Sequence, residues 1–129
     1  MINLSAYQAC QFRVTVELWR DAEKFGSVNY DGGNLQFTTA AGGTTGWAVL
    51  DGSGMGYDGS LIQCTGTCVV AGEKVWTTSN SPKWKTAVYE AASPPGSTLW
   101  LRFTFASDSE NTNGPLPGVF VRRVRVEAY

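Results

Sequence analysis

The stretch STLWLRFTFASD, residues 97–108, decides the class of fold. Its side chains alternate strictly between two faces, a period of two that suits a strand and not a helix. One face carries Leu99, Leu101, Phe103 and Phe105, and the other carries Trp100, Arg102 and Thr104. We therefore predict a strand whose first face packs against a core and whose second face points outward.

The same alternation recurs along the chain. In CQFRVTVELW, residues 10–19, one face carries Cys10, Phe12, Val14, Val16 and Leu18. Further strands are predicted over residues 33–39, 46–52, 83–91 and 118–129, and a short hairpin over residues 60–72. In the last strand, the face predicted to be apolar carries Phe120, Arg122, Val124 and Val126.

Helical signals are weak, with at most one turn over residues 20–25. The 15 glycines fall mostly between the predicted strands, where turns are expected. Together these patterns predict an all-β fold, a β-sandwich of two antiparallel sheets. No internal repeat or linker divides residues 1–129, so we predict one domain.

Composition limits the partners. The chain has 129 residues, 43% hydrophobic and 16% charged, with a net charge of −1. That balance argues against nucleic acid or an anionic membrane surface as a partner. No apolar run approaches the roughly 20 residues of a membrane helix. The start, MINLSAYQACQF, has no signal-peptide pattern, so we expect a module excised from a larger protein.

An enzyme is not expected. The chain contains no histidine, which removes Ser-His and Cys-His nucleophile pairs. Glu17, Asp21 and Glu23 are close in sequence, as the paired carboxylates of a glycosidase could be. The strand pattern places Glu17 on the outward face, however, and nothing marks an acid–base pocket around it.

The three cysteines divide into a close pair and a single residue. Cys64 and Cys68, in CTGTC, could close a small disulfide loop in an oxidising compartment, or remain two reduced thiols beside a turn. A zinc site would need more Cys or His ligands than the chain holds. Cys10 alternates with the apolar residues that follow it, so a buried and inert thiol is expected.

Several motifs occur in a characteristic order. They are VTVELWRDAE at 14–23, YDGGNLQFTTAAGGTTGW at 30–47, SPKWKTAVYEAA at 81–92, GSTLWLRFTFASD at 96–108 and the closing GVFVRRVRV. In their order and spacing they resemble the MAM-like jelly-roll modules of secreted bacterial proteins, such as those attached to immune inhibitor A-type metallopeptidases. The resemblance covers most of the chain, although no single motif is specific.

The resemblance implies a jelly roll that serves as a non-catalytic module of a larger extracellular protein. Such modules usually have a strand before the segment INLSAYQA, residues 2–9. Without that strand, the sheet would keep an edge open to strand addition from another chain or domain.

The resemblance also implies an acidic corner that could hold calcium, contributed by Glu23, Asp31 and perhaps Asp108. The chain departs from the family here, because Arg122 and Arg123 replace a closing Asp-Asp pair. We therefore hypothesise that the Arg122 guanidinium occupies the place of the cation and pairs with Glu23 or Asp31. A live calcium site remains the alternative, as does an Arg122 that reaches the sandwich edge unpaired. The sequence Asp31-Gly32-Gly33 is predicted to be a structural turn at this corner.

The aromatic residues suggest a binding role. By resemblance, Trp47, Trp76 and Trp84 are expected to pack in the core. Trp100, Tyr57 and Trp19 are the candidates for stacking on a sugar, unless a loop covers the ring.

Three functions follow. The first is an accessory or adhesion module of a secreted or surface protein, binding other domains of its parent, a glycan or a surface protein. The second is a carbohydrate-binding module, and the third is a self-assembling structural subunit.

Overall fold

A computed structural model describes residues 1–22, 24–26, 28–60, 70, 72–78, 83–107 and 118–129. Its regular elements are strands and three short 3-10 turns, with no α-helix among these residues. The strands are β1 (Ile2–Asn3), β2 (Phe12–Asp21), β3 (Lys24–Phe25), β4 (Val28–Asn29), β5 (Gly32–Thr38), β6 (Ala48–Val49), β7 (Gly59–Ser60), β8 (Lys74–Val75), β9 (Lys85–Ala91), β10 (Thr98–Ala106) and β11 (Gly118–Ala128). The 3-10 turns are Ser5–Tyr7, Ala41–Gly43 and Ser53–Met55. The all-β prediction is confirmed, and the single helical turn considered over residues 20–25 is not formed.

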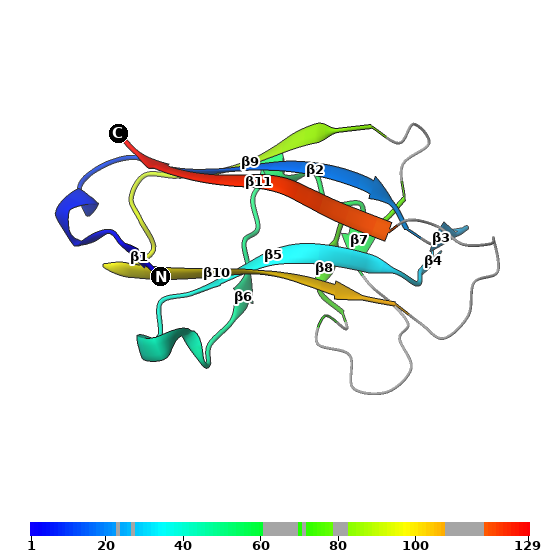
Figure 1. Ribbon diagram of the computed structural model, residues 1–129, viewed down its shortest axis with the longest axis horizontal. Helices are drawn as coiled ribbons and strands as arrows, with labels where there is room; N and C mark the ends of the chain where they lie inside the picture. The colour runs from blue at the N-terminus through cyan, green and yellow to red at the C-terminus, as the bar shows by residue number, and fades with distance from the viewer. Residues whose placement is uncertain (23, 27, 61–69, 71, 79–82, 108–117) are drawn as a thin grey trace.

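Two antiparallel sheets form facing layers (Figure 1). One sheet has the strand order β11-β2-β9, and the other has the order β1-β10-β5-β6. Strands β3 and β4 pair with each other, as do β7 and β8. A bridge between Gly33 and Trp76 joins the end of β8 to β5. Most of these pairings connect segments that are far apart in the sequence.

The core lies between the two layers. Alternation along β2 buries Phe12, Val14, Val16 and Leu18 against residues of the facing sheet such as Leu35 and Leu99. Burying an aliphatic or aromatic side chain of this size contributes about 1.5–3 kcal/mol to the free energy of unfolding. The alternation predicted for 10–19 is therefore confirmed, except that Cys10 precedes the strand and its free thiol is only half-buried.

The Asp-Gly-Gly sequence is not a turn, contrary to the prediction. Gly32 and Gly33 begin β5, and Asp31 is buried immediately before them. A Cβ atom on Gly33 would lie 2.7 Å from Cζ of Phe103, and one on Gly32 would lie 2.7 Å from Cγ2 of Val75. The two glycines are thus required by the close approach of neighbouring side chains, not by a turn conformation.

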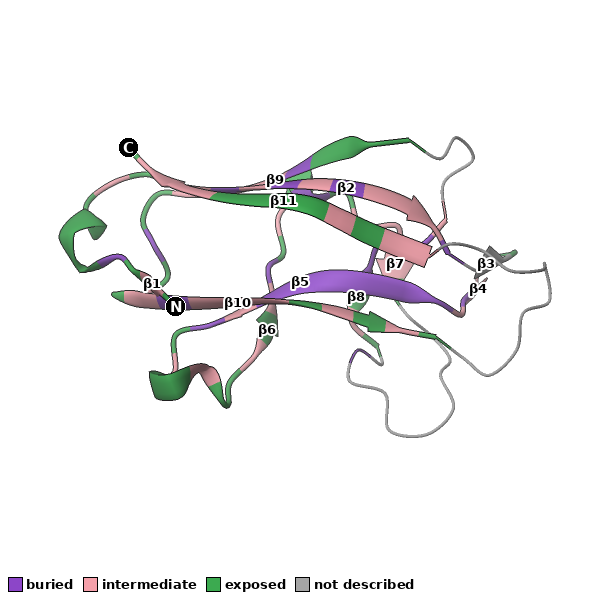
Figure 2. Ribbon diagram, viewed as in Figure 1, coloured by how far each residue is buried: buried purple, intermediate pink, exposed green. Residues whose placement is uncertain are grey.

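Strand β5 is buried along almost its whole length, whereas much of β11 is half-buried or exposed (Figure 2). Even the polar side chains of β5 on its outer face are covered. Asn34 and Gln36 donate hydrogen bonds to the same Glu73 oxygen, at 2.9 and 2.6 Å. Buried amides of this kind need such partners, because an unpaired one would be costly.

Strand β10 is only partly buried on its inner face. Leu99 is fully buried, but Phe103 and Phe105 are 37% and 40% exposed. The prediction that all the apolar residues of this strand lie in the core is therefore wrong at its distal end. The short β1 pairs only with Thr98 and Leu99, so the rest of that edge of β10 has no partner strand among the described residues.

Candidate functional site

A β-bulge in β11 decides which of its side chains reach the solvent. The pairing with β2 shifts between Val121, which lies opposite Leu18, and Arg123, which lies opposite Glu17. One extra residue, Arg122, is accommodated there, so the alternation of faces changes phase. The predicted face of β11 is therefore wrong for Phe120 and Arg122, which do not share the core side with Val124 and Val126.

The bulge places an aromatic ring beside Trp19 on the outer face of the three-stranded sheet. Phe120 lies opposite Trp19, and their ring centroids are 5.7 Å apart. The register that pairs Leu18 with Lys85, continued by one residue, brings Trp84 level with Trp19. Trp84 is 45% exposed and Phe120 is 50% exposed. We call Trp19, Trp84 and Phe120 the aromatic row, which runs from the residue before β9 across β2 to β11.

An arginine–glutamate pair lies beside the aromatic row. Arg122 donates a hydrogen bond from Nε to Oε2 of Glu17 at 2.9 Å, and its Nη2 lies 2.7 Å from the same oxygen. The Arg122 guanidinium carbon is also 4.6 Å from the centre of the Trp84 ring, a cation–π contact. Arg122 thus spans β2 and connects β11 with the start of β9.

The charge of Glu17 is stabilised by its neighbours. The hydrogen bond from Arg122 lowers the pKa of the Glu17 carboxyl, and the positive charges of Arg122 and Arg123 lower it further. Arg123 approaches Glu17 only loosely, with Nη1 3.7 Å from Oε1. Glu17 is therefore a carboxylate shared by two arginines on an open surface.

These contacts contradict the face predicted for Arg122, whereas its predicted pairing with Glu23 is not tested, because Glu23 lies outside the described residues. The Arg122 side chain lies on the outer, solvent-exposed face and pairs with Glu17, whereas the prediction placed it on the apolar face beside Glu23 or Asp31. The bulge is the reason for the difference. Glu23 and Asp108 lie outside the described residues, as do Cys64 and Cys68 with their predicted disulfide. Within the described part of the chain, no group of three His, Cys, Asp or Glu side chains could hold a metal ion, so calcium stays a prediction.

The three predicted ligand-binding aromatics do not come together. Trp19 belongs to the aromatic row on β2. Trp100 lies on the outer face of the other sheet, opposite Thr38, where Gly43 packs so closely that a Cβ there would be 2.5 Å from the ring. One side of the Trp100 ring is therefore covered by a loop, the alternative raised for this residue.

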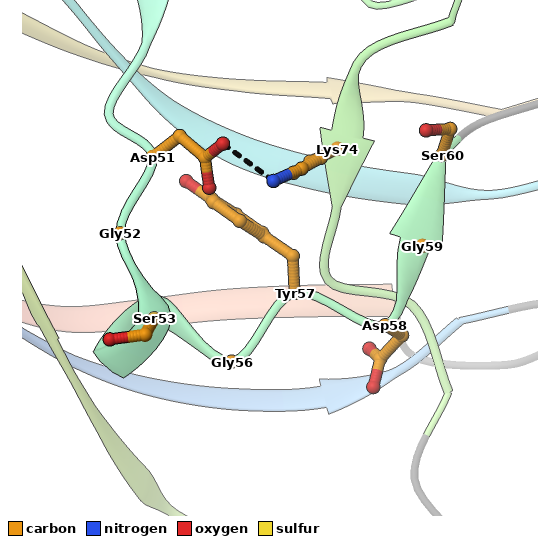
Figure 3. Close-up of a pocket in the computed structure, with 9 residues that line it drawn as sticks. All are labelled: Asp51, Gly52, Ser53, Gly56, Tyr57, Asp58, Gly59, Ser60 and Lys74. Atoms are coloured by element: carbon orange, nitrogen blue, oxygen red, sulfur yellow. Dashed lines mark hydrogen bonds and ion pairs between the residues drawn. The ribbon is translucent and has the colours of Figure 1, made fainter.

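Tyr57 lies in a cleft of about 490 Å³, shown in Figure 3. The cleft is lined by Asp51, Gly52, Ser53, Gly56, Tyr57, Asp58, Gly59, Ser60 and Lys74. Burial raises the pKa of the Tyr57 hydroxyl, which lies within hydrogen-bonding distance of the carbonyl oxygens of Leu35 and Leu50. Its ring centroid is 4.7 Å from that of Trp76. The Tyr57 ring is thus a structural support of the cleft.

The charged groups of this cleft are already paired. Lys74 Nζ lies 2.6 Å from Asp51 Oδ2 (Figure 3). Asp58 Oδ2 lies 2.8 Å from Nη1 of Arg20 and accepts the backbone N–H of Thr77 at 2.8 Å. The charged side chains that line the cleft are therefore all engaged in ion pairs.

The tryptophans expected in the core divide three ways. Trp76 is fully buried and donates its indole N–H to the Met55 carbonyl at 2.7 Å, as predicted for a packing residue. Trp47 is half-buried, with the Arg102 guanidinium carbon 4.2 Å from its ring centre. Trp84 is exposed, so its prediction as a core residue is wrong.

Sequence reasoning missed Trp84 and Phe120 as members of the site. The adjacent pair Arg122-Arg123 was a signal for this, because strict alternation would place one of the two charges in the core. A bulge at Arg122-Arg123 avoids that cost by keeping both arginines outside.

Comparison of the chain with known protein families, curated proteins and solved structures gave no match. The likeness to MAM-like modules therefore remains a prediction from motifs. No helix among the described residues is long and apolar enough to cross a membrane.

Proposed function

We propose that this protein is a non-catalytic binding module that holds a carbohydrate chain on the aromatic row. The observation that supports this proposal is the presence of three aromatic side chains in one line across an outer sheet face, two of them about half exposed. The C–H bonds on one face of a sugar ring form an apolar surface with a slight positive charge. That surface complements the negative face of an aromatic ring.

The dimensions of the row suit an extended ligand. Neighbouring strands lie about 4.8 Å apart, so three strands spread the row over roughly 10 Å. A disaccharide unit of a chain can cover such a span. The Arg122–Glu17 pair beside the row supplies donors and an acceptor for the hydroxyl groups of the sugar.

A catalytic role is not proposed for this site. A glycosidase needs a carboxylic acid with a raised pKa to protonate the leaving group. The pKa of Glu17 is instead lowered, mainly by its hydrogen bond from Arg122, so at neutral pH it is a poor proton donor.

We place this module in a larger extracellular or cell-surface protein, as an accessory or adhesion unit with a jelly-roll fold. The motif resemblance supports this setting. The antiparallel sheets, whose neighbouring strands are distant in sequence, are consistent with jelly-roll connectivity.

Affinity electrophoresis against a panel of soluble polysaccharides tests the function, with Trp84→Ala as the informative variant. Loss of one stacking ring is worth about 1 kcal/mol or more, so we expect binding to weaken by roughly fivefold or more. Tyr7→Ala is the matched control, because Tyr7 is 46% exposed but lies far from the row. If every polysaccharide that slows the wild type slows Trp84→Ala equally, the proposal is contradicted.

Self-assembly is a second candidate function, supported by the open edges of β10 and β11. Phe103, Phe105 and Val124 are each more than a third exposed on the inner faces of these strands. Neither β11 nor the distal part of β10 has a further partner strand among the described residues on that side. Edges of this kind can pair with another chain.

A further inference from the structure

We propose that the ligand of the aromatic row is an acidic polysaccharide, whose carboxylate or sulfate groups bind Arg123. This inference rests on the proposed function and adds the chemical class of the carbohydrate. It follows from the way in which charges are shared on the outer face of β11-β2-β9.

Arginines on this face are paired one to one, except beside the row. Arg13 pairs with Glu90, and Arg125 pairs with Glu127. At the row, Arg122 and Arg123 share the single carboxylate of Glu17. One positive charge is therefore in excess at the place where the aromatic rings are exposed.

The two arginines at the row have different roles. Arg122 is fixed by its hydrogen bond to Glu17 and by the Trp84 ring, so it helps to build the surface. Arg123 is 69% exposed, and its contact to Glu17 at 3.7 Å is too long for a hydrogen bond. The planar guanidinium of Arg123 can thus offer two parallel N–H donors to an anionic group of the ligand.

Other charges near the row leave the balance positive. Lys83 is exposed immediately before Trp84, and Asp21 follows Trp19 by two residues on the same strand face. Of the described charges beside the row, Arg122, Arg123 and Lys83 are positive and Glu17 and Asp21 are negative, whereas Lys85, opposite Leu18, belongs to the other face of the sheet. The whole chain has a net charge of −1, so the local balance at the row is opposite in sign to that of the chain as a whole.

Single-stranded nucleic acid is the competing ligand, because its bases also stack on aromatic rings and its phosphates also bind arginine. A local excess of one charge on an overall anionic chain gives little of the counterion release that drives such binding. The observations therefore favour a polysaccharide with separated negative charges over a polyphosphate.

The test compares matched polysaccharides on the full chain by biolayer interferometry. The pairs are polygalacturonate with its methyl ester, carboxymethylcellulose with hydroxyethylcellulose, and dextran sulfate with dextran. For at least one pair we expect the acidic member to bind at least tenfold more tightly, with affinity that falls between 50 and 200 mM salt. Arg123→Gln should remove most of that preference, whereas Arg125→Gln, a change on the same strand face, should leave it intact.

The outcomes separate this inference from the proposed function. If the protein binds both members of each pair equally, and Trp84→Ala still weakens that binding, the preference for an acidic ligand is overturned. Carbohydrate binding by the aromatic row would then still stand. No binding to any member would overturn both. Tighter binding to oligo(dT) than to every polysaccharide would also overturn both, in favour of nucleic acid.

Discussion

At the scale of single residues, Glu17 connects the electrostatics of the outer face to the proposed binding surface. Its carboxylate accepts a hydrogen bond from Arg122, and this bond is the main cause of its lowered pKa. A carboxyl group with a lowered pKa in the folded state contributes stability above its unfolded pKa. That contribution is lost as the pH falls through the folded pKa, which for Glu17 lies below its ordinary value.

Arg122→Gln should therefore raise the pKa of Glu17 toward the usual value of about 4.3. Carboxyl titration by NMR measures this directly. Arg125→Gln is the control, because Arg125 pairs with Glu127 and should leave the Glu17 titration unchanged. A Glu17 that titrates alike in wild type and Arg122→Gln would show that the hydrogen bond is not the cause of the shift.

At the scale of elements, the success of sequence reasoning depended on how regular each strand is. Strand β2 keeps strict alternation, so its buried face could be assigned correctly from the sequence. Strand β11 contains a bulge that hydrophobic period alone does not reveal, and one extra residue moved Phe120 and Arg122 to the other side. The burial of Gly32 and Gly33 could not be foreseen either, because it depends on contacts with Val75 and Phe103 that are distant in sequence.

The same dependence explains the missed members of the site. Trp19, one of the predicted candidates, lies on a strand whose alternation is regular. Trp84 and Phe120 join it only through cross-strand registers that are set in three dimensions. The resemblance placed Trp84 in the core, but its position just before β9 leaves it on the solvent side.

The bulge can be tested by removing its extra residue. Deleting Arg122 would bring Arg123 directly after Val121 while each keeps its present partner on β2, so the core side of β11 would be preserved. We expect the deletion to cost less than about 1 kcal/mol of unfolding free energy, since it removes an exposed residue and restores a regular ladder.

Deleting Val121 is the matched comparison, because it would send a charged residue to the core side opposite Leu18. That variant should lose several kcal/mol or fail to fold. Urea unfolding followed by circular dichroism measures both. Similar losses for the two deletions would contradict the assigned register.

At the scale of the whole molecule, the described residues of the two sheets leave the lateral side along β10 and β11 partly exposed. Phe103, Phe105 and Val124 line that side. If it serves self-assembly, the protein should form dimers as its concentration rises, and Val124→Lys should keep it monomeric by burying a charge at the contact.

Sedimentation velocity over a hundredfold range of concentration measures this association. Thr86→Lys is the control, since Thr86 is exposed on the outer face of β9. A wild type that remains monomeric throughout would remove self-assembly as a candidate.

Both chain ends leave the same end of the two-layer structure, as Figure 1 shows. Tyr129 exchanges backbone hydrogen bonds with Gln11, and Ile2 and Tyr129 line a common pocket. From Gln11 to Trp19, the extended strand carries the aromatic row roughly 26 Å away from that end. A biosensor tip or a fused reporter enzyme attached to either terminus would thus lie at the end of the molecule distant from the aromatic row and leave the row accessible to solvent. A short peptide joining Tyr129 to Met1 would make a circular chain without crossing that surface.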